Sequence, residues 1–295
     1  MRLLLANNGA PPEAPLRRSF RSMAKDLGVD EGTIRARTMK LQEQGVLKGW
    51  YLGVSPSVTG HDIIHAWLIV EPGASKEDVI GRLLTSKDVE RVCNYLGPKL
   101  SAVVRCNSGT SPELALQDLA TVAGLRNALH EQGSLRVPRH DLSATDAKII
   151  EILRGDPWKP YSELATLLRL SAKTVKRRVT NLAEAGDIYM IPIIDLKALQ
   201  GIVPMELLVE YTSAESKAGV NRAVMSRVRE NLVFSDTSGP FGYFALAVPN
   251  VVYVEQTAEW VRRQKGVKAV RSEALLDVVL NRNYYELAPG FSRPI

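Results

Sequence analysis

Apolar residues between positions 171 and 184 recur at the spacing of one helical face. Val175, Val179 and Leu182 follow the i, i+4, i+7 pattern of a buried stripe. The intervening positions are polar or charged, so this segment is predicted to be an amphipathic helix. After it, residues 188–194 form an apolar run that predicts a strand.

A shorter helix is predicted just before this segment, over Tyr161 to Arg169, with its own apolar face. Ser171 lies between the two helices and is a favourable N-cap for the second. A third helix is predicted upstream, over Thr145 to Arg154. Two helices joined by a short turn and followed by a strand are typical of a winged helix-turn-helix.

The same pattern occurs a second time, 141 residues earlier in the chain. Its cap is Asp30, and of a preceding helix only Arg2 to Ala6 remains. Because both the spacing of the apolar residues and the positions of the capping and turn residues are repeated, the chain contains two copies of one unit. The identical pairs at this offset include Ala24 with Ala165, Leu27 with Leu168, Thr33 with Thr174, Arg37 with Arg178, Leu41 with Leu182 and Gly45 with Gly186.

Each winged unit is followed by alternating strand and helix patterns in the order βαββαβ, which is the ferredoxin-like arrangement. In the second copy these are Val203 to Tyr211, Ser213 to Glu230, Leu232 to Thr237, Tyr243 to Val248, Val251 to Gln264 and Val267 to Leu280. In the first copy they are Ile63 to Glu71, Lys76 to Thr85, Arg91 to Tyr95, Ser101 to Cys106, Pro112 to Ala123 and Ser134 to Val137.

The predicted fold class is therefore α+β, with tandem winged helix-turn-helix domains that are each followed by a ferredoxin-like βαββαβ domain. The expected boundaries are 1–55 for the first winged unit, 60–138 for the first ferredoxin-like domain, 141–196 for the second winged unit, 201–287 for the second ferredoxin-like domain and 288–295 for a tail.

Two stretches carry a resemblance to a known family. D-L-S-A-T-D-A-K-I-I-E-I-L begins at Asp141, and L-A-x-L-L-x-L-S-x-K-T-V-x-R-R-V-x-x-L-x-x-A-G begins at Leu164. The chain thereby resembles the Lrp/AsnC family of transcriptional regulators, in two tandem copies. The resemblance implies binding to double-stranded DNA, sensor domains that pair into dimers, and in many members a response to amino acids.

The resemblance also implies an effector site near one turn of the sensor domain. The family's turn usually reads Gly-x-x-Asp, whereas this chain has Gly239-Pro240-Phe241-Gly242 and lacks the carboxylate. Gly239, Phe241 and Tyr243 are the ligand-binding candidates here. A small-molecule effector stays open as an alternative, and the partners expected are double-stranded DNA and either a second chain or an intrachain pseudo-dimer.

The second helix of the later winged unit is predicted to be a DNA-reading helix. Its buried stripe leaves Ala172, Lys173, Lys176 and Arg177 facing outward, where they could enter the major groove. Cations there would neutralise phosphates and release counterions. Ser171, Thr174 and Arg178 flank the stripe and suit phosphate contacts.

The equivalent outward positions in the first copy are Glu31, Gly32, Arg35 and Ala36, which carry far less positive charge. The DNA-contacting candidates there are Thr33, Arg35 and Arg37. Unequal roles are expected, with the second copy the stronger reader. If both copies engage DNA, the site should contain two different half-sites about one helical turn (~34 Å) apart or a multiple of it.

The composition is that of a folded protein, and its positive net charge favours a polyanion as partner. The chain has 295 residues, 38 Lys and Arg against 32 Asp and Glu, and a net charge of +6. Two cysteines without metal-ligand spacing and the lack of a long apolar run favour the cytoplasm. No cofactor and no metal site are expected, since His61 and His65 are four residues apart around the start of a predicted strand, where such positions lie about 13 Å apart.

Two other classes of function remain as alternatives. Sirohaem decarboxylases share this architecture and use His and Arg in the sensor-like half, where the second copy of this chain has no His and the strands of the first offer His65 alone. The other alternative is an interaction scaffold with winged helices that do not bind DNA. We expect a sequence-specific regulator that is not an enzyme.

Overall fold

The computed structural model describes residues 16–17, 19–55, 58, 61–107, 111–125, 128–130, 142–237 and 241–281. The chain divides into two compact units, and each unit gathers the equivalent parts of both repeats. The helical unit comprises residues 1–60, 138–198 and 286–295, and the sheet unit comprises residues 61–137 and 199–285. In the described residues, no helix is long and apolar enough to cross a membrane.

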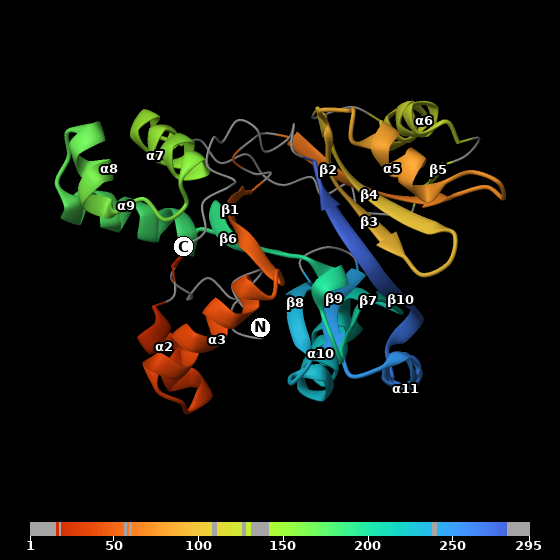
Figure 1. Ribbon diagram of the computed structural model, residues 1–295. Helices are drawn as coiled ribbons and strands as arrows, with labels where there is room; N and C mark the ends of the chain where they lie inside the picture. The colour runs from red at the N-terminus through yellow and green to blue at the C-terminus, as the bar shows by residue number, and fades with distance from the viewer. Residues whose placement is uncertain are drawn as a thin grey trace. The chain divides into compact units, whose positions relative to one another are not determined.

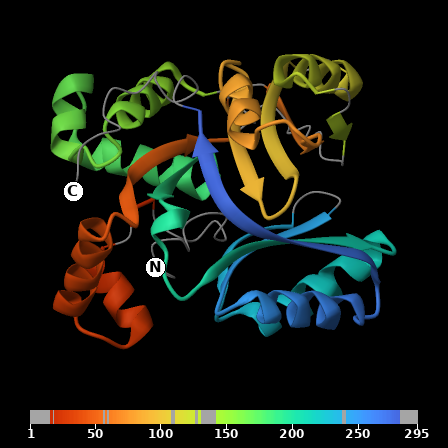
Figure 2. The same ribbon diagram turned by 45° about the vertical axis from the view of Figure 1, so that its right-hand side comes forward.

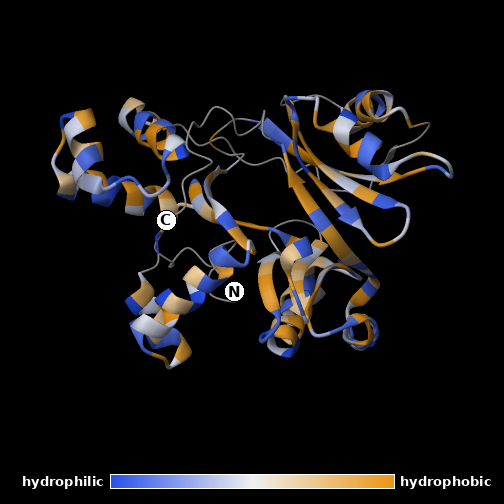
Figure 3. Cartoon of the chain, in the orientation of Figure 1, coloured by the Kyte–Doolittle hydropathy of each residue, from blue (hydrophilic) through white to orange (hydrophobic). Residues whose placement is uncertain are grey.

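The helical unit contains both helix-turn-helix pairs and the strand that follows each (Figure 1). Its helices alternate between hydrophobic and hydrophilic residues along their length, as their predicted amphipathic character requires (Figure 3). The segment Arg2 to Ala6 lies outside the described residues. The elements are α2 (Phe20–Leu27), α3 (Glu31–Glu43), β1 (Leu47–Val54), α7 (Ala144–Gly155), α8 (Tyr161–Leu168), α9 (Ala172–Glu184), β6 (Ile188–Ile194) and the short 3₁₀ helix η1 (Leu196–Ala198).

The strands β1 and β6 pair with each other in an antiparallel two-stranded sheet. Each was expected to start a wing for its own copy, but its partner is the equivalent strand of the other copy. The ladder runs from Leu47 opposite Ile194 to Val54 opposite Ile188. Gly53 allows this close approach, because a Cβ there would lie 2.3 Å from the ring of Tyr189.

A single hydrophobic core holds the helical unit together, and both copies contribute to it. Because a strand presents side chains to alternating faces and a helix presents one stripe, the two strands and the helices can bury apolar residues against one another. The core residues include Met23, Ile34, Leu47, Trp50 and Leu52 from the first copy and Ile149, Leu153, Leu164, Val175, Val179, Leu182, Ile188 and Met190 from the second.

Among the described residues, the sheet unit contains eight strands in the order β5-β2-β4-β3-β10-β7-β9-β8. Each half repeats the strand order of a ferredoxin-like domain, with the last strand of the motif beside the first. The first half contains β2 (His61–Ile69), α5 (Lys76–Leu83), β3 (Val89–Tyr95), β4 (Lys99–Asn107), α6 (Pro112–Ala123) and β5 (Ala128–His130). The second contains β7 (Val203–Tyr211), α10 (Ala214–Val228), β8 (Leu232–Asp236), β9 (Phe241–Val248), α11 (Val251–Arg262) and β10 (Val267–Leu280).

The long strand β10 joins the two halves of the sheet (Figure 2). Its first part pairs with β7 of its own copy, from Val267 opposite Tyr211 to Ala274 opposite Met205. Its last part pairs with β3 of the other copy, from Leu275 opposite Tyr95 to Leu280 opposite Arg91. The two copies are thus paired within one chain at β1–β6 and again at β3–β10.

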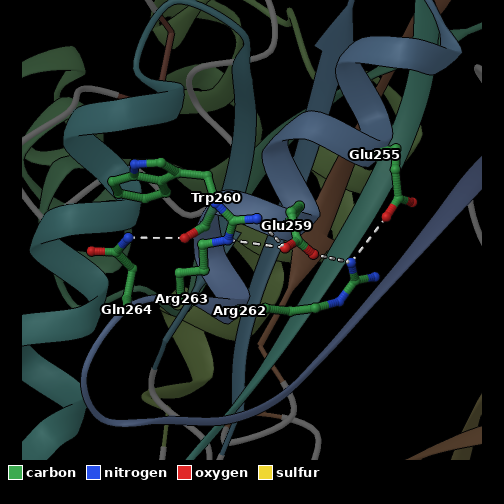
Figure 4. A network of polar contacts seen from close by, with 6 residues as sticks. All are labelled: Glu255, Glu259, Trp260, Arg262, Arg263 and Gln264. Carbon is green, nitrogen blue, oxygen red and sulfur yellow. Dashed lines mark hydrogen bonds and ion pairs between the residues drawn. The ribbon is translucent and has the colours of Figure 1, made fainter.

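Helices cover one face of each half of the sheet, and each half has its own apolar core. The final strand expected at Ser134 to Val137 lies outside the described residues, and the edge position is taken by β5, which pairs with β2. Around the C-terminal end of α11, Arg262 contacts Glu255 at 3.0 Å and Arg263 contacts Glu259 at 2.7 Å (Figure 4). These pairs are largely exposed and contribute little to stability.

Candidate nucleic-acid interface

The outer face of α9 carries three cations that project into solvent. Lys173, Lys176 and Arg177 are exposed, while Val175 and Val179 on the opposite face are fully buried at 0% exposure. The burial of the stripe fixes the rotation of the helix, so the cations form a continuous surface with Ala172. This arrangement offers a dense positive surface on the exposed face of α9.

The first turn of α9 is closed by its own side chains. Ser171 accepts a hydrogen bond from the backbone N–H of Thr174 at 3.0 Å, and the two hydroxyl oxygens lie 2.8 Å apart. Such a cap stabilises a helix by about 1 kcal/mol. Ser171 and Thr174 were predicted to contact DNA, and the structure places both at the exposed N-terminal end of α9 with these hydroxyl groups already hydrogen-bonded to each other.

Arg178 lies on the side of α9 that faces α7. Its guanidinium donates to both carboxylate oxygens of Asp146, at 3.0 and 3.1 Å, and to the hydroxyl of Ser143 at 3.3 Å. The Asp146 side chain is only 17% exposed and that of Arg178 is 33% exposed. The pair therefore ties α9 to α7, and the phosphate contact expected of Arg178 stays a prediction.

We expect Arg178→Ala to lower the free energy of unfolding by about 1–2 kcal/mol, because Asp146 is left partly buried without its partner. Urea unfolding checks this. Arg178→Lys keeps the charge without the planar fork and should recover part of the loss. A variant of unchanged stability that binds DNA much more weakly would instead assign Arg178 to phosphate contact.

The equivalent helix α3 presents a different surface. Arg35 contacts Glu31 at 3.3 Å and lies over the ring of Phe20 at 5.0 Å, so its charge is partly neutralised within its own unit. Thr33 donates its backbone N–H to the capping Asp30 at 2.8 Å, which leaves Arg37 as the third predicted residue, on the exposed face. The first copy thus offers less free positive charge than the second.

Of the three ligand-binding candidates, Tyr243 belongs to a buried polar cluster. Gly239 lies outside the described residues, and Phe241 is half-buried at the start of β9. Tyr243 donates a hydrogen bond of 2.6 Å to Glu206 on β7, and Tyr95 on β3 donates another to the same carboxylate. Tyr95 stacks on Trp67 with a centroid distance of 5.1 Å. This cluster links the two copies across the joined sheet, so Tyr243 has a structural role there.

Burial dominates the electrostatics of this cluster. It raises the pKa of Glu206, against the opposing effect of the hydrogen bonds from Tyr243 and Tyr95. It also raises the pKa of Cys93 to about 12 and the pKa values of Tyr95 and Tyr243 well above their ordinary range. Cys93, Tyr95 and Tyr243 therefore keep their protons in the folded chain at pH values where the free side chains would lose them.

The raised pKa values predict that the sheet unit loses stability in alkali. An unfolded thiol or phenol releases its proton near pH 8.5 or 10, respectively, while the folded chain keeps it, so stability falls as pH rises through that range. Urea midpoints measured from pH 7 to 10.5 should decline. Tyr243→Phe removes one of the titrating phenols and should flatten the decline above about pH 10. Midpoints that stay constant over this range would contradict the assignment.

One residue that ties the copies together was not predicted from the sequence. Arg17 donates to the backbone carbonyl of Lys159 at 2.9 Å and lies over the ring of Tyr161 at 4.8 Å. Beside it, Trp158 packs edge-on against Trp50 of β1 at 5.8 Å. A lone arginine has no sequence signal for such a contact, because its partners lie 142 residues away.

The whole fold is similar to solved structures of an enzyme. Two crystal structures of the siroheme decarboxylase NirDL cover 96% of this chain and 95% of their own, with TM-scores of 0.55 and 0.53 and identities of 14% and 15%; the second holds an iron-uroporphyrin III analogue. The expectation that this chain is not an enzyme is contradicted by these matches, because the architecture that suggested a regulator is also that of a decarboxylase. At this identity the likeness is one of fold.

Sequence comparison locates a family signal in the second copy. The HTH-type transcriptional regulator Ptr1 of Methanocaldococcus jannaschii is 27% identical over 112 residues, which are 31% of this chain and 76% of Ptr1. Residues 142–183 match the family model of the AsnC-type helix-turn-helix domain, and they span α7, α8 and nearly all of α9. The resemblance to the Lrp/AsnC family is thereby confirmed, and the segment that carries the exposed cations matches the AsnC-type helix-turn-helix domain.

Proposed function

We propose that this protein is a sequence-specific regulator that binds double-stranded DNA through α9. The observation that carries the proposal is the exposed row of Lys173, Lys176 and Arg177 on the second helix of an AsnC-type helix-turn-helix. In this motif the second helix lies in the major groove with its N-terminal residues at the base edges. The relative Ptr1 is named a transcriptional regulator, which supports the same reading.

The three cations suit two kinds of contact. Arg and Lys donate to guanine O6 and N7 in the major groove, and each good pair contributes about 1–3 kcal/mol of discrimination. Any of them that meets a phosphate instead adds affinity without sequence preference. Ser171 and Thr174 lie at the end of the helix that would approach the backbone, where polar side chains and N–H groups bind phosphate.

Fluorescence anisotropy with labelled duplexes at several salt concentrations tests the proposal. Specific fragments should bind below about 1 µM at ~0.1 M salt, and the affinity should fall linearly on a log–log plot against salt. Genomic fragments provide candidate sites, and a shuffled duplex of the same composition is the control. If no duplex binds even at ~0.05 M salt, DNA recognition is the wrong function.

A second candidate is a decarboxylase that acts on an iron tetrapyrrole. The full-length fold match to NirDL favours it. The arrangement of the first half of the sheet also favours it. His65 on β2 and Arg91 on β3 both lie opposite Val103 on β4, so their side chains share the face of the sheet away from the helices. A cationic side chain there could hold a carboxylate of the substrate.

Titration with iron-uroporphyrin III tests this candidate, with absorbance as the measurement. A saturating change in the porphyrin band that is lost in His65→Ala, but kept in the Lys173/Lys176/Arg177→Ala variant, would support it. If the spectrum of the porphyrin is unaltered by a stoichiometric excess of the native chain, this candidate fails.

A further inference from the structure

The two helix-turn-helix pairs are joined by a fixed contact within one chain. β1 and β6 share a seven-pair ladder, and both pack into the common core of the helical unit. Arg17 adds a clamp from the first copy to the α7–α8 turn of the second. Because these contacts lie within one compact unit, α3 and α9 are held in one mutual arrangement.

The register of the ladder has the symmetry of a two-fold dimer. At the 141-residue offset of the repeat, Trp50 corresponds to Ile191 and Tyr51 to Pro192. In the ladder, Trp50 lies opposite Pro192 and Tyr51 opposite Ile191, so exchanging the two copies exchanges these two pairs. The next pairs outward obey the same rule, since Leu52 opposite Met190 corresponds to Ile193 opposite Gly49. A local two-fold axis therefore passes between the two central pairs.

The two-fold relation of the strands implies the same relation for the helices that precede them, because α3 packs on β1 and α9 packs on β6. Each strand follows its reading helix after a short turn, which is closed by Gly45 in one copy and Gly186 in the other, both with left-handed φ values of 70° and 74°. The two reading helices are thus presented in opposite directions, as they are in a dimeric helix-turn-helix protein. Such a pair matches the two-fold symmetry of the DNA backbone with one chain.

The chemistry of the two reading faces is unequal. The positions of Ala172, Lys173 and Arg177 on α9 are occupied on α3 by Glu31, Gly32 and Ala36. Arg35, which corresponds to Lys176, is paired with Glu31. Within the part of the chain that the structure describes, the α9 face therefore offers three outward cations without an ion-pair partner. The α3 face is close to neutral and places a carboxylate where phosphate or a base edge would lie.

We infer that one chain reads a single bipartite DNA site whose two half-sites are inverted and unequal. This inference rests on the proposed DNA binding. The α9 half-site is the strongly specified one and contains guanine, because its readers are Lys and Arg. The α3 half-site is weakly specified, and its distance from the first is fixed by the β1–β6 ladder.

Selection from a random duplex library, followed by native mass spectrometry of the best complexes, tests this inference. We expect one strongly and one weakly conserved half-site in inverted orientation, and one chain per duplex. Inserting about 5 bp between the halves turns one half-site to the opposite face of the duplex and should weaken binding about 10-fold or more, while the same insertion outside the site has no effect. Two equal inverted halves bound by two chains overturn the inference but leave DNA binding intact. If no sequence is enriched and no duplex binds, the proposed function fails with it.

The unequal faces also predict the effect of one carboxylate. Glu31→Gln frees Arg35 and removes a negative charge from the reading end of α3, so affinity for the selected site should rise roughly 3- to 10-fold. Glu43→Gln makes the same change of charge at the opposite end of α3 and is the matched control, with an expected change of less than about twofold. Equal effects of the two substitutions, or a loss of affinity in Glu31→Gln, would show that α3 does not face DNA.

Discussion

Replacing Lys173, Lys176 and Arg177 together by alanine is expected to lower the affinity for a specific duplex about 100- to 1000-fold at ~0.1 M salt. The three side chains are exposed and take no part in the core, so the change removes charge without removing packing. Alanine is also the most favourable residue for a helix interior. We therefore expect the free energy of unfolding to stay within about 0.5 kcal/mol of the native value.

The salt dependence identifies how the cations act. Each phosphate that a protein neutralises adds about 0.9 to the log–log slope of affinity against salt, so three lost phosphate contacts would reduce the slope by nearly 3. A smaller reduction with a lost preference for guanine would place the side chains at base edges instead. Anisotropy over a salt series on the selected duplex and on a shuffled one separates the two.

A matched control removes the same charge from another helix surface. Arg262, Arg263 and Lys265 are exposed at the end of α11, and the two arginines contact glutamates of that helix (Figure 4). Their replacement by alanine changes the net charge by the same amount and should alter affinity by less than about threefold. If both triple variants lose affinity equally, net charge rather than α9 is responsible.

Much of the fold follows from patterns that are local in the sequence. The alternation of apolar residues and the turn residues at their ends placed β7 at Val203–Tyr211 and β10 at Val267–Leu280 with the bounds that the structure has. The helix α9 was predictable for the same reason, since its stripe and its cap are read within a few residues. The outward direction of Lys173, Lys176 and Arg177 follows from that stripe.

Pairing between the copies was not predictable in the same way. Periodicity says which face of a strand is buried but does not name the partner, so β1 and β6 were expected to form separate wings. Glu206 is a second example, because it alternates with the buried Met205 and Leu207 and should face solvent. It is buried by Tyr95, which lies 111 residues earlier in the chain.

By contrast, the pairing of Glu31 with Arg35 did have a signal in the sequence. The two residues are four apart on a predicted helix, which is the spacing of a surface ion pair. Their contact lowers the charge that α3 can offer to DNA. The unequal charge of α3 and α9 was therefore visible from charge patterning, whereas the two-fold register of β1 and β6 required the structure.

Tyr95→Ala is expected to lower the free energy of unfolding of the sheet unit by about 3–5 kcal/mol, as is usual for the loss of a large buried aromatic side chain. Tyr95 is 1% exposed, stacks on Trp67, and donates to Glu206, with Ser101 2.9 Å from its hydroxyl oxygen. Its removal leaves a cavity and takes one hydrogen bond from a carboxylate that is only 9% exposed. Urea unfolding followed by circular dichroism measures the loss.

Two further substitutions divide that loss between packing and polarity. Tyr95→Phe keeps the ring and removes the hydroxyl, so about 1–3 kcal/mol should be lost. In a Glu206→Gln background the same substitution should cost less, because a neutral amide tolerates the lost donor better than a buried carboxylate does. Tyr253→Phe is the matched control. The Tyr253 hydroxyl accepts a hydrogen bond of 2.8 Å from Asn231 at a half-buried site, and its removal should cost less than about 1 kcal/mol.

One combined result would contradict this role of the cluster: Tyr95→Phe costs no more than Tyr253→Phe, and Glu206→Gln does not change that cost. The cluster would then not hold the two copies together, and the β3–β10 pairing alone would join the sheet.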